Sequence, residues 1–308
     1  MLRIVDGFVY EGKPSPDRFA VTLHDLGNGH REACVQRAID WVESGPLDPD
    51  SIAAQVLRGE REDPAAEEKR EANRLRSARR AKTRVRRLCK ALGVDSLLTL
   101  TYRANQADLA VMKAHFKEFV RRMRRVIGHW VDVVDVKTGE VSQKWVSTFC
   151  YVAAFERQKR GAWHSHIATH RLPRELPAKN GVKVKSFNIV RAIWRGVTKD
   201  FGGNIDSQNA KPWHSPGRLA AYLSKYMLKA FDEGDDWSNR YSGSESSNIP
   251  KPVRLEFMKA ALGDLVDLVH AEVCVGNCDV FSWLSRFGDT FYISTEPVGD
   301  RQLRRWEI

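Results

Sequence analysis

Residues 144–170, KWVSTFCYVAAFERQKRGAWHSHIATH, decide the fold of this chain. Both ends of the stretch are rich in β-branched and aromatic residues, which predicts two strands, 144–156 and 163–170, joined by a polar turn. A further strand over 130–136 precedes them and forms a hairpin with the first. Hairpins that follow one another in this way predict an antiparallel sheet.

The elements around these strands follow an order that is typical of an α+β fold. A strand is predicted over 96–102 (SLLTLTY), and residues 107–127 repeat apolar side chains with the helical period. Two more helices are predicted, over 188–201 and 215–230, with a short strand between them; Ser and Pro at the start of the second are typical of a helix N-terminus. We therefore expect a central antiparallel β-sheet with flanking helices packed on one side of it.

The rest of the chain is predicted to be mainly helical. Residues 1–60 are expected to form a small helical lead-in, with an amphipathic helix over 33–43. Polar, Gly- and Ser-rich residues after position 232 are typical of a linker, and a helix is predicted around 254–272. We divide the chain into a helical, basic N-terminal region (1–92), a central domain (93–231), and a linker with a C-terminal helical region (232–308).

Positive charge is concentrated in one predicted helix. The chain carries 50 Lys and Arg against 39 Asp and Glu, a net charge of +11, which favours a polyanionic partner. Residues 69–90 hold eleven of these cations and a single acid, Glu71. This density predicts contacts with nucleic-acid phosphates, for which we name Arg79, Arg80, Arg86 and Arg87. The plainer interpretation is a solvated basic helix that packs through Leu75, Val85 and Leu88.

Several classes of protein are excluded by what the sequence lacks. The chain contains no run of about 18 apolar residues, so we expect no membrane-spanning helix, and it has no apolar signal core at its start. Five cysteines, an odd number, argue against a disulfide framework and for a reducing compartment. The Walker pattern of nucleotide-binding loops is absent.

The turn after the strand 144–156 brings together residues that could hold a metal ion. Gly161 supplies the positive φ of a three-residue turn, which pairs Glu156 with His164 or His166 and puts all three on one face of the sheet. Two imidazoles and a carboxylate leave positions open for water or a phosphate oxygen. With a two-residue turn Glu156 would point to the opposite face, and Gln158 would be the next candidate. The alternative is a pair of ordinary polar histidines on a half-buried strand.

A second group of reactive side chains shares one face of the helix predicted over 215–230. Tyr222 and Tyr226 lie four residues apart, and Lys225 lies between them in the sequence. A phenol has a pKa of about 10, so a nucleophilic tyrosine needs a nearby cation or another group that favours its anion. The alternative is a pair of core aromatics beside a lysine whose stem covers them.

These motifs, taken together and in this order, resemble those of the HUH endonucleases, the rolling-circle replication initiators of plasmids and single-stranded DNA phages. The run LTLTYR at 98–103 looks like the first motif of the family. E-x-Q-x-R-G-A-x-H-x-H at 156–166 looks like its metal motif, and Y-x-x-K-Y at 222–226 looks like its nucleophile motif, in the two-tyrosine form. The resemblance covers about residues 95–230. Ser165 departs from the family, which usually has a hydrophobic residue there.

The resemblance implies an RRM-like palm and a divalent metal, Mg²⁺ or Mn²⁺, held by Glu156, His164 and His166. Tyr222 would attack the scissile phosphate of single-stranded or extruded origin DNA and leave a 5′-phosphotyrosine and a free 3′-OH. Tyr226 would make the second cut, and Lys225 would stabilise developing charge. Implied partners are a host replication helicase and polymerase in the cytoplasm of a bacterial host, with no membrane. Two alternatives stay open: a two-tyrosine HUH transposase or relaxase, and a non-catalytic nucleic-acid-binding protein.

Overall fold

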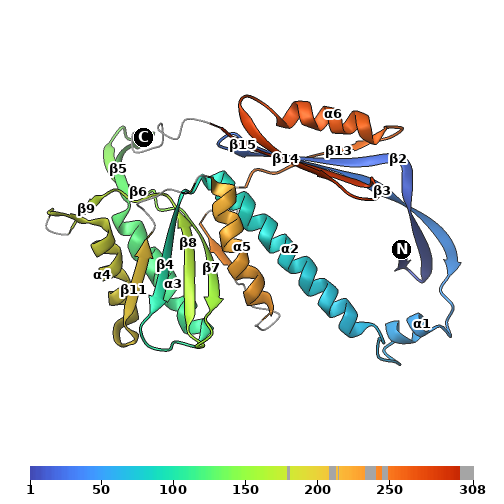
Figure 1. The fold of residues 1–308 in the computed structure, drawn as a ribbon, viewed down its shortest axis with the longest axis horizontal. Coiled ribbons are helices and arrows are strands. Elements are labelled where there is room, and N and C mark those ends of the chain that lie inside the picture. Colours follow the sequence, from blue (N-terminus) through green and yellow to red (C-terminus); the bar gives the residue numbers. More distant parts are fainter. Residues whose placement is uncertain (179–180, 208–212, 214, 233–240, 245–248, 299–308) are drawn as a thin grey trace. The chain divides into compact units, whose positions relative to one another are not determined.

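The computed structural model describes residues 1–308 except 179–180, 208–212, 214, 233–240, 245–248 and 299–308, and for 227–232 it describes the backbone alone. The chain divides into two compact units, Arg76–Ile249 and Met1–Leu75 together with Pro250–Ile308. Figure 1 labels the elements of both. Each unit is described by itself.

A five-stranded antiparallel sheet forms the centre of the unit Arg76–Ile249. Its strand order is β11-β4-β8-β7-β12. The predicted strands over 96–102 and 163–170 are confirmed, and the α+β fold with a central antiparallel sheet is confirmed with them. The strands are β4 (Ser96–Tyr102), β7 (Tyr151–Arg157), β8 (Trp163–Thr169), β11 (Gly203–Ser207) and β12 (Tyr241–Gly243).

Helices cover both faces of this sheet. On one face α3 (Leu109–Val126) and α4 (Ser186–Thr198) pack on a core that includes Trp163 and Ile167 of β8. On the other face α2 (Ala66–Leu92) and α5 (Pro216–Asp232) pack on a core that includes Ala168. The expectation of helices on one side only is therefore wrong. The physical reason is that all seven residues of β8 are buried, so that both faces of the strand need a covering layer.

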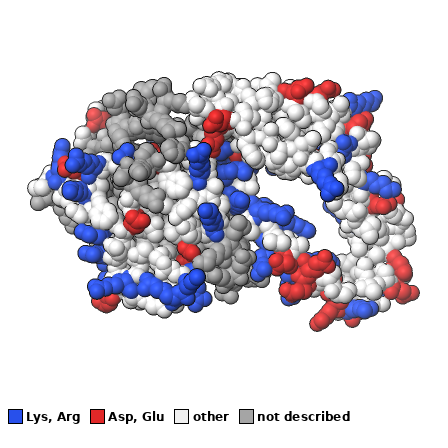
Figure 2. All heavy atoms as spheres, in the orientation of Figure 1, with Lys and Arg blue, Asp and Glu red and all other residues white. Residues whose placement is uncertain are grey.

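α2 is the long basic helix that the sequence predicts. It spans 27 residues, with acidic residues in its first turn and Lys90 in its last. Gly93, with φ 62°, follows its end. Val85 and Leu88 are fully buried, as expected, but Leu75 is 48% exposed and does not serve as a packing residue. In the face that Figure 2 displays, basic side chains follow α2 and acidic ones gather around its start.

β5 (Gly128–Val134) and β6 (Val141–Ser147) form a two-stranded sheet of their own. The prediction of one continuous strand over 144–156 is wrong, because β6 ends at Ser147 and β7 starts afresh at Tyr151. The hydroxyl of Ser147 and the backbone N–H of Thr148 both donate to the carbonyl of Ile127, at the end of α3. These bonds turn the chain out of the hairpin before it enters the central sheet. β9 (Glu175–Pro177) and β10 (Lys183–Lys185) form another small two-stranded sheet.

The second unit is built on a six-stranded antiparallel sheet that joins the two ends of the sequence. One face of the sheet packs on α6 (Leu262–Val273), through a core that includes Val35, Val269 and Ile293. The strands are β1 (Leu2–Val5), β2 (Phe8–Gly27), β3 (His30–Pro46), β13 (Val253–Phe257), β14 (Cys278–Leu284) and β15 (Thr290–Pro297).

This unit corrects two predictions of helix. Residues 33–43 lie in β3, where Ala33 and Val35, two residues apart, enter the core together, as strand geometry requires. Within residues 1–60, all of which the structure describes, helix is confined to α1 (Ile52–Leu57). The helix predicted around 254–272 begins only at Leu262, after β13. The linker predicted after position 232 falls partly outside the described residues, and the domain boundaries at 92 and 231 stay predictions.

Over the described part of the chain, every helix is too short or too polar to cross a membrane.

Candidate active site

The turn between β7 and β8 fixes the register of the site. The backbone N–H of Gln158 donates to the carbonyl of Ala162 over 2.8 Å, which leaves residues 159–161 in the turn. Gly161 has φ 88°, a conformation that a side chain would strain. Glu156 therefore lies directly opposite His164 in the ladder. The predicted register is confirmed, with the carboxylate and both imidazoles on one face.

His166 is held on both sides. Its Nε2 lies 3.0 Å from Oε2 of Glu156 and its Nδ1 lies 3.3 Å from the hydroxyl of Thr99 on β4. A carboxylate only accepts, so Nε2 carries the proton and Nδ1 accepts from Thr99. Thr99 was not predicted as a site residue. Its place in the run LTLTYR, directly opposite His166 across the β4–β8 ladder, is the signal that could have found it.

His164 is buried and its ring is not fully engaged. Its Nε2 is buried and has no hydrogen-bond partner within the described part of the chain. Burial, and to a lesser extent the neighbouring His166, lower the pKa of His164 to about 4. Burial also lowers the pKa of His166, against the opposing effect of Glu156. Both imidazoles are therefore neutral near pH 7, the form that ligates metals.

These residues fit a divalent cation by chemistry. Two neutral imidazoles and a carboxylate are suitable donors, and the unsatisfied Nε2 of His164 is a lone pair or N–H in search of a partner. However, the described residues contain no group of three or more His, Cys, Asp or Glu side chains already arranged to hold a metal ion. Gln158, the reserve candidate, has its side-chain oxygen hydrogen-bonded to Arg160. The metal site stays a prediction.

α5 brings the two tyrosines to the histidines. The helix begins at Pro216, and the hydroxyl of Ser215 accepts a hydrogen bond from the backbone N–H of Arg218, as expected of an N-cap. The ring of Tyr226 stacks on the ring of His166, with centroids 3.7 Å apart and planes 13° apart. The hydroxyl of Tyr226 donates to the hydroxyl of Tyr222 over 2.6 Å. The two predicted constellations therefore form one site.

The surroundings of the two phenols differ. Burial, followed by the hydrogen bond to Tyr222, raises the pKa of Tyr226 well above its ordinary value. Tyr222 stands edge-on to His166 and lies against the indole of Trp213, with centroids 5.2 Å apart. Lys225 is exposed, and its Nζ lies 5.8 Å from the centroid of the Tyr222 ring. The cation is thus beside Tyr222.

Residues 95–231 match a family model described as Replication-associated protein ORF2. The match supports a rolling-circle replication initiator. It includes the central sheet up to β11, both histidines, Glu156 and the two tyrosines, whereas α2 and the second unit lie outside it. Neither the curated proteins nor the solved structures contain a significant match to the chain.

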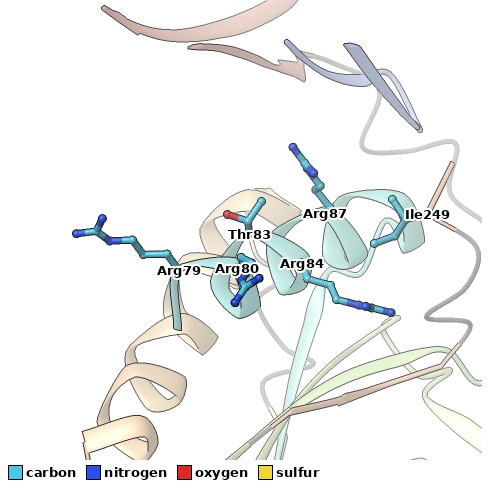
Figure 3. Close-up of a pocket in the computed structure, with 6 residues that line it drawn as sticks. All are labelled: Arg79, Arg80, Thr83, Arg84, Arg87 and Ile249. Carbon is cyan, nitrogen blue, oxygen red and sulfur yellow. The ribbon is translucent and has the colours of Figure 1, made fainter. Parts of the chain in front are cut away.

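The basic helix of the chain lies on the same face of the sheet as the tyrosines. Ala81, Val85 and Leu88 of α2 share one core with residues of α5, and Tyr222 and Tyr226 pack against that core. Outside the core, α2 lines a hollow of about 520 Å³, together with Ile249 (Figure 3). Its lining from α2 consists of Arg79, Arg80, Thr83, Arg84 and Arg87.

Three of the four arginines predicted to contact DNA line this hollow, and the fourth does not. Arg86 is half-buried and is absent from the lining, whereas Arg84, which the prediction omitted, is exposed and lines it. The helical period explains the difference. Residues 80, 84 and 87 lie three and four apart and share a face, whereas 86 is rotated away from it.

Proposed function

We propose that this protein initiates rolling-circle DNA replication by nicking single-stranded origin DNA with Tyr222. The observation that carries the proposal is the hydrogen bond of 2.6 Å between the two phenols, one of which is stacked on His166. It puts two potential nucleophiles beside a buried Glu-His pair. The family match over residues 95–231 supports the same function.

Glu156, His164 and His166 would hold a divalent cation, Mg²⁺ or Mn²⁺. Such an ion supplies charge neutralisation at the scissile phosphate when it is bound. The ring of His166 is fixed by Thr99 and Glu156 on its two nitrogens, so its orientation is set before any ligand arrives. Neutral imidazoles at pH 7 need not lose a proton to ligate.

Tyr222 is the better first nucleophile of the two. The hydroxyl of Tyr226 donates to its oxygen, and a donated hydrogen bond stabilises a phenolate more than a phenol. The ammonium of Lys225 near the same ring favours the anion further. Tyr226, by contrast, has a raised pKa and needs the first reaction to change its surroundings before it can act.

The proposed chemistry is a transesterification. The oxygen of Tyr222 forms a bond to phosphorus, and the bond from phosphorus to the 3′ oxygen of the preceding nucleotide breaks. The phenol proton is released, the departing oxygen takes up a proton, and the products are a 5′-phosphotyrosine and a free 3′-OH. A host polymerase would extend this 3′-OH while a host helicase opens the duplex. Tyr226 would later attack the regenerated origin in the same manner and release the strand.

The experiment uses single-stranded M13-type DNA that carries the intergenic region of the candidate replicon. Incubation with Mg²⁺ or Mn²⁺ and denaturing electrophoresis should yield a metal-dependent nick with protein bound to the 5′ end of the downstream fragment. A transposase or relaxase would give the same adduct but would transfer the strand to a different target. Binding without any covalent product would leave the non-catalytic alternative.

A further inference from the structure

The β5–β6 hairpin exposes a pair of tryptophans. Trp130 and Trp145 face each other across the two strands, with ring centroids 5.6 Å apart in an edge-to-face arrangement. Trp130 is 61% exposed, an uncommon state for the largest apolar side chain. Val134 and Val141, the next apolar pair on the same face, are 57% and 67% exposed. This face of the hairpin therefore presents apolar surface to solvent.

The base of the hairpin is fixed to the end of α3. The indole N–H of Trp145 donates to the carbonyl of Arg124 over 2.8 Å. Gly128 begins β5 under the same indole, where a Cβ would meet the carbonyl oxygen of Val146. These contacts hold the tryptophan pair in one orientation, and a rigid aromatic platform loses little conformational entropy when it binds a ligand.

Two uncompensated cations adjoin the tryptophans. Arg124 and Arg125 lie in the last turn of α3, and both are exposed. Arg121 and Arg122 are ion-paired with Glu118, but within the described residues neither Arg124 nor Arg125 has an ion pair. The acid on the tryptophan face, Asp132, accepts a hydrogen bond from Gln143 and lies further out along the hairpin.

We propose that Trp130, Trp145, Arg124 and Arg125 form a stacking site for single-stranded DNA. Aromatic rings beside free guanidinium groups match a ligand that has flat bases and a phosphate backbone. Duplex DNA fits less well, because its bases are stacked on each other and are not available to tryptophan. The excess of positive charge on the chain agrees with a polyanion rather than an apolar protein partner.

This site is separate from the candidate active site. The hairpin joins the central sheet at the Tyr151 end of β7, whereas Glu156 lies near the opposite end of that strand. At about 3.4 Å for each residue, the two positions are roughly 17 Å apart along β7. The hairpin would therefore hold nucleotides remote from the scissile phosphate, and its role in binding does not depend on whether Tyr222 nicks.

The test measures binding of the full chain to a fluorescent oligothymidylate of roughly 30 nucleotides, about twice the largest site of a single-stranded-DNA-binding module. No metal is added, so nicking cannot contribute. Trp130→Ala should weaken binding by about 5- to 100-fold, and Trp130→Phe should retain most of the affinity. The matched control is Trp283→Ala, which removes an exposed tryptophan (46%) of β14 and should leave binding unchanged.

A second variant tests the cations. Changing Arg124 and Arg125 together to Gln should lower the salt dependence of log K by about 0.7 for each phosphate that the variant no longer binds. Unchanged affinity in Trp130→Ala, or an equal loss in Trp283→Ala, would overturn the proposal. Equal losses on duplex and single-stranded DNA would overturn the stacking role. A change of molecular mass in sedimentation with unaltered DNA binding would instead assign the face to a second copy of the chain.

Discussion

The hydroxyl of Tyr226 donates a hydrogen bond of 2.6 Å to the hydroxyl of Tyr222, while its ring lies flat on His166. The bond makes the two phenols unequal, because one donates and the other accepts. An accepting phenol oxygen is better prepared to carry negative charge. The division of labour between the tyrosines is therefore expected to follow from this one contact.

Tyr226→Phe tests that inequality. The change removes the donated hydrogen bond and little else, so the first cleavage should slow by about 2- to 10-fold, the usual contribution of such a bond. The measurement is the initial rate of covalent adduct formation at saturating DNA. Tyr10→Phe, in the second unit, is the control. Complete loss of the first adduct in Tyr226→Phe would reverse our assignment and make Tyr226 the first nucleophile.

Thr99→Val should weaken metal binding without removing a proposed ligand. The hydroxyl of Thr99 orients His166 through its Nδ1, and removal of such a hydrogen bond typically costs about 10- to 100-fold in metal affinity. Titration with Mn²⁺ followed by calorimetry measures the effect. Thr101→Val is a matched control on the same face of β4, where the hydroxyl donates to the carbonyl of Asn204 instead. If both variants bind Mn²⁺ like the unaltered protein, Thr99 does not orient a ligand.

The α2 arginines should contribute to DNA affinity unequally. Neutralising Arg79, Arg80, Arg86 and Arg87 together should weaken binding to all sequences and flatten the salt dependence, by about 0.7 to 0.9 for each phosphate that is no longer bound. Arg84→Gln alone should weaken binding more than Arg86→Gln alone, because only Arg84 lines the hollow. Unchanged affinity and salt dependence in the fourfold variant would reduce α2 to a solvated, packing helix.

His164→Ala should abolish metal-dependent nicking and preserve the fold. The Nε2 of His164 has no hydrogen-bond partner among the described residues, so its removal breaks no such bond. We expect loss of Mn²⁺ binding and a melting temperature within a few degrees of the unaltered value, a shift that corresponds to about 1 kcal/mol or less. A variant that still nicks in a metal-dependent manner would remove His164 from the site.

Local patterns in the sequence were enough to predict most of the candidate site. Gly161 fixes a three-residue turn, and with it the pairing of Glu156 opposite His164, because strand parity leaves one solution. Ser215 and Pro216 fix the start of α5, and a spacing of four residues then puts both tyrosines on one face. The contact between Tyr226 and His166 is tertiary, and no local pattern encodes it.

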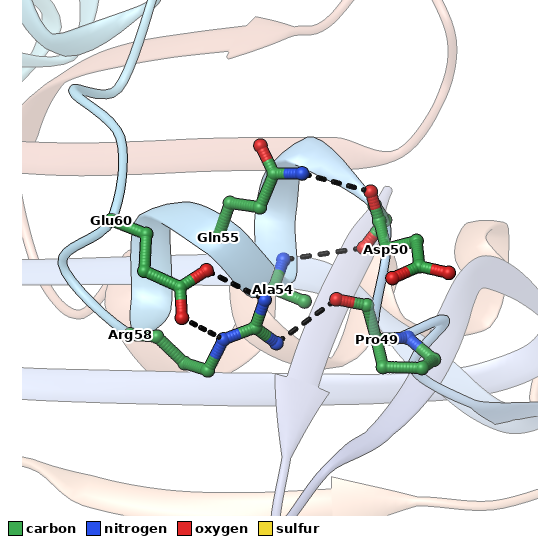
Figure 4. A network of polar contacts seen from close by, with 7 residues as sticks. Pro49, Asp50, Ala54, Gln55, Arg58 and Glu60 are labelled. Carbon is green, nitrogen blue, oxygen red and sulfur yellow. Dashed lines mark hydrogen bonds and ion pairs between the residues drawn. The ribbon is translucent and has the colours of Figure 1, made fainter.

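The second unit could not be predicted in the same way. Its sheet pairs Val21 with Leu255 and Val35 with Phe291, positions that are separated by most of the chain. Strand pairing at such distance leaves no periodic signal, so the apolar residues of 33–43 were assigned to a helix. What helix exists there, α1, is short. It is bordered by Arg58, which donates to Glu60 and to the carbonyl of Pro49 (Figure 4).

The most direct test of the central claim is to identify the residue that becomes joined to DNA. A single-stranded substrate with the candidate origin and a 3′ label is incubated with each protein in Mn²⁺, and the labelled adduct is digested and sequenced by mass spectrometry. The account predicts a 5′-phosphate ester on Tyr222, a sharp loss of adduct in Tyr222→Phe, and none in the Tyr222→Phe, Tyr226→Phe double variant. Covalent DNA in the double variant, or an adduct on any residue other than these two tyrosines, would contradict it.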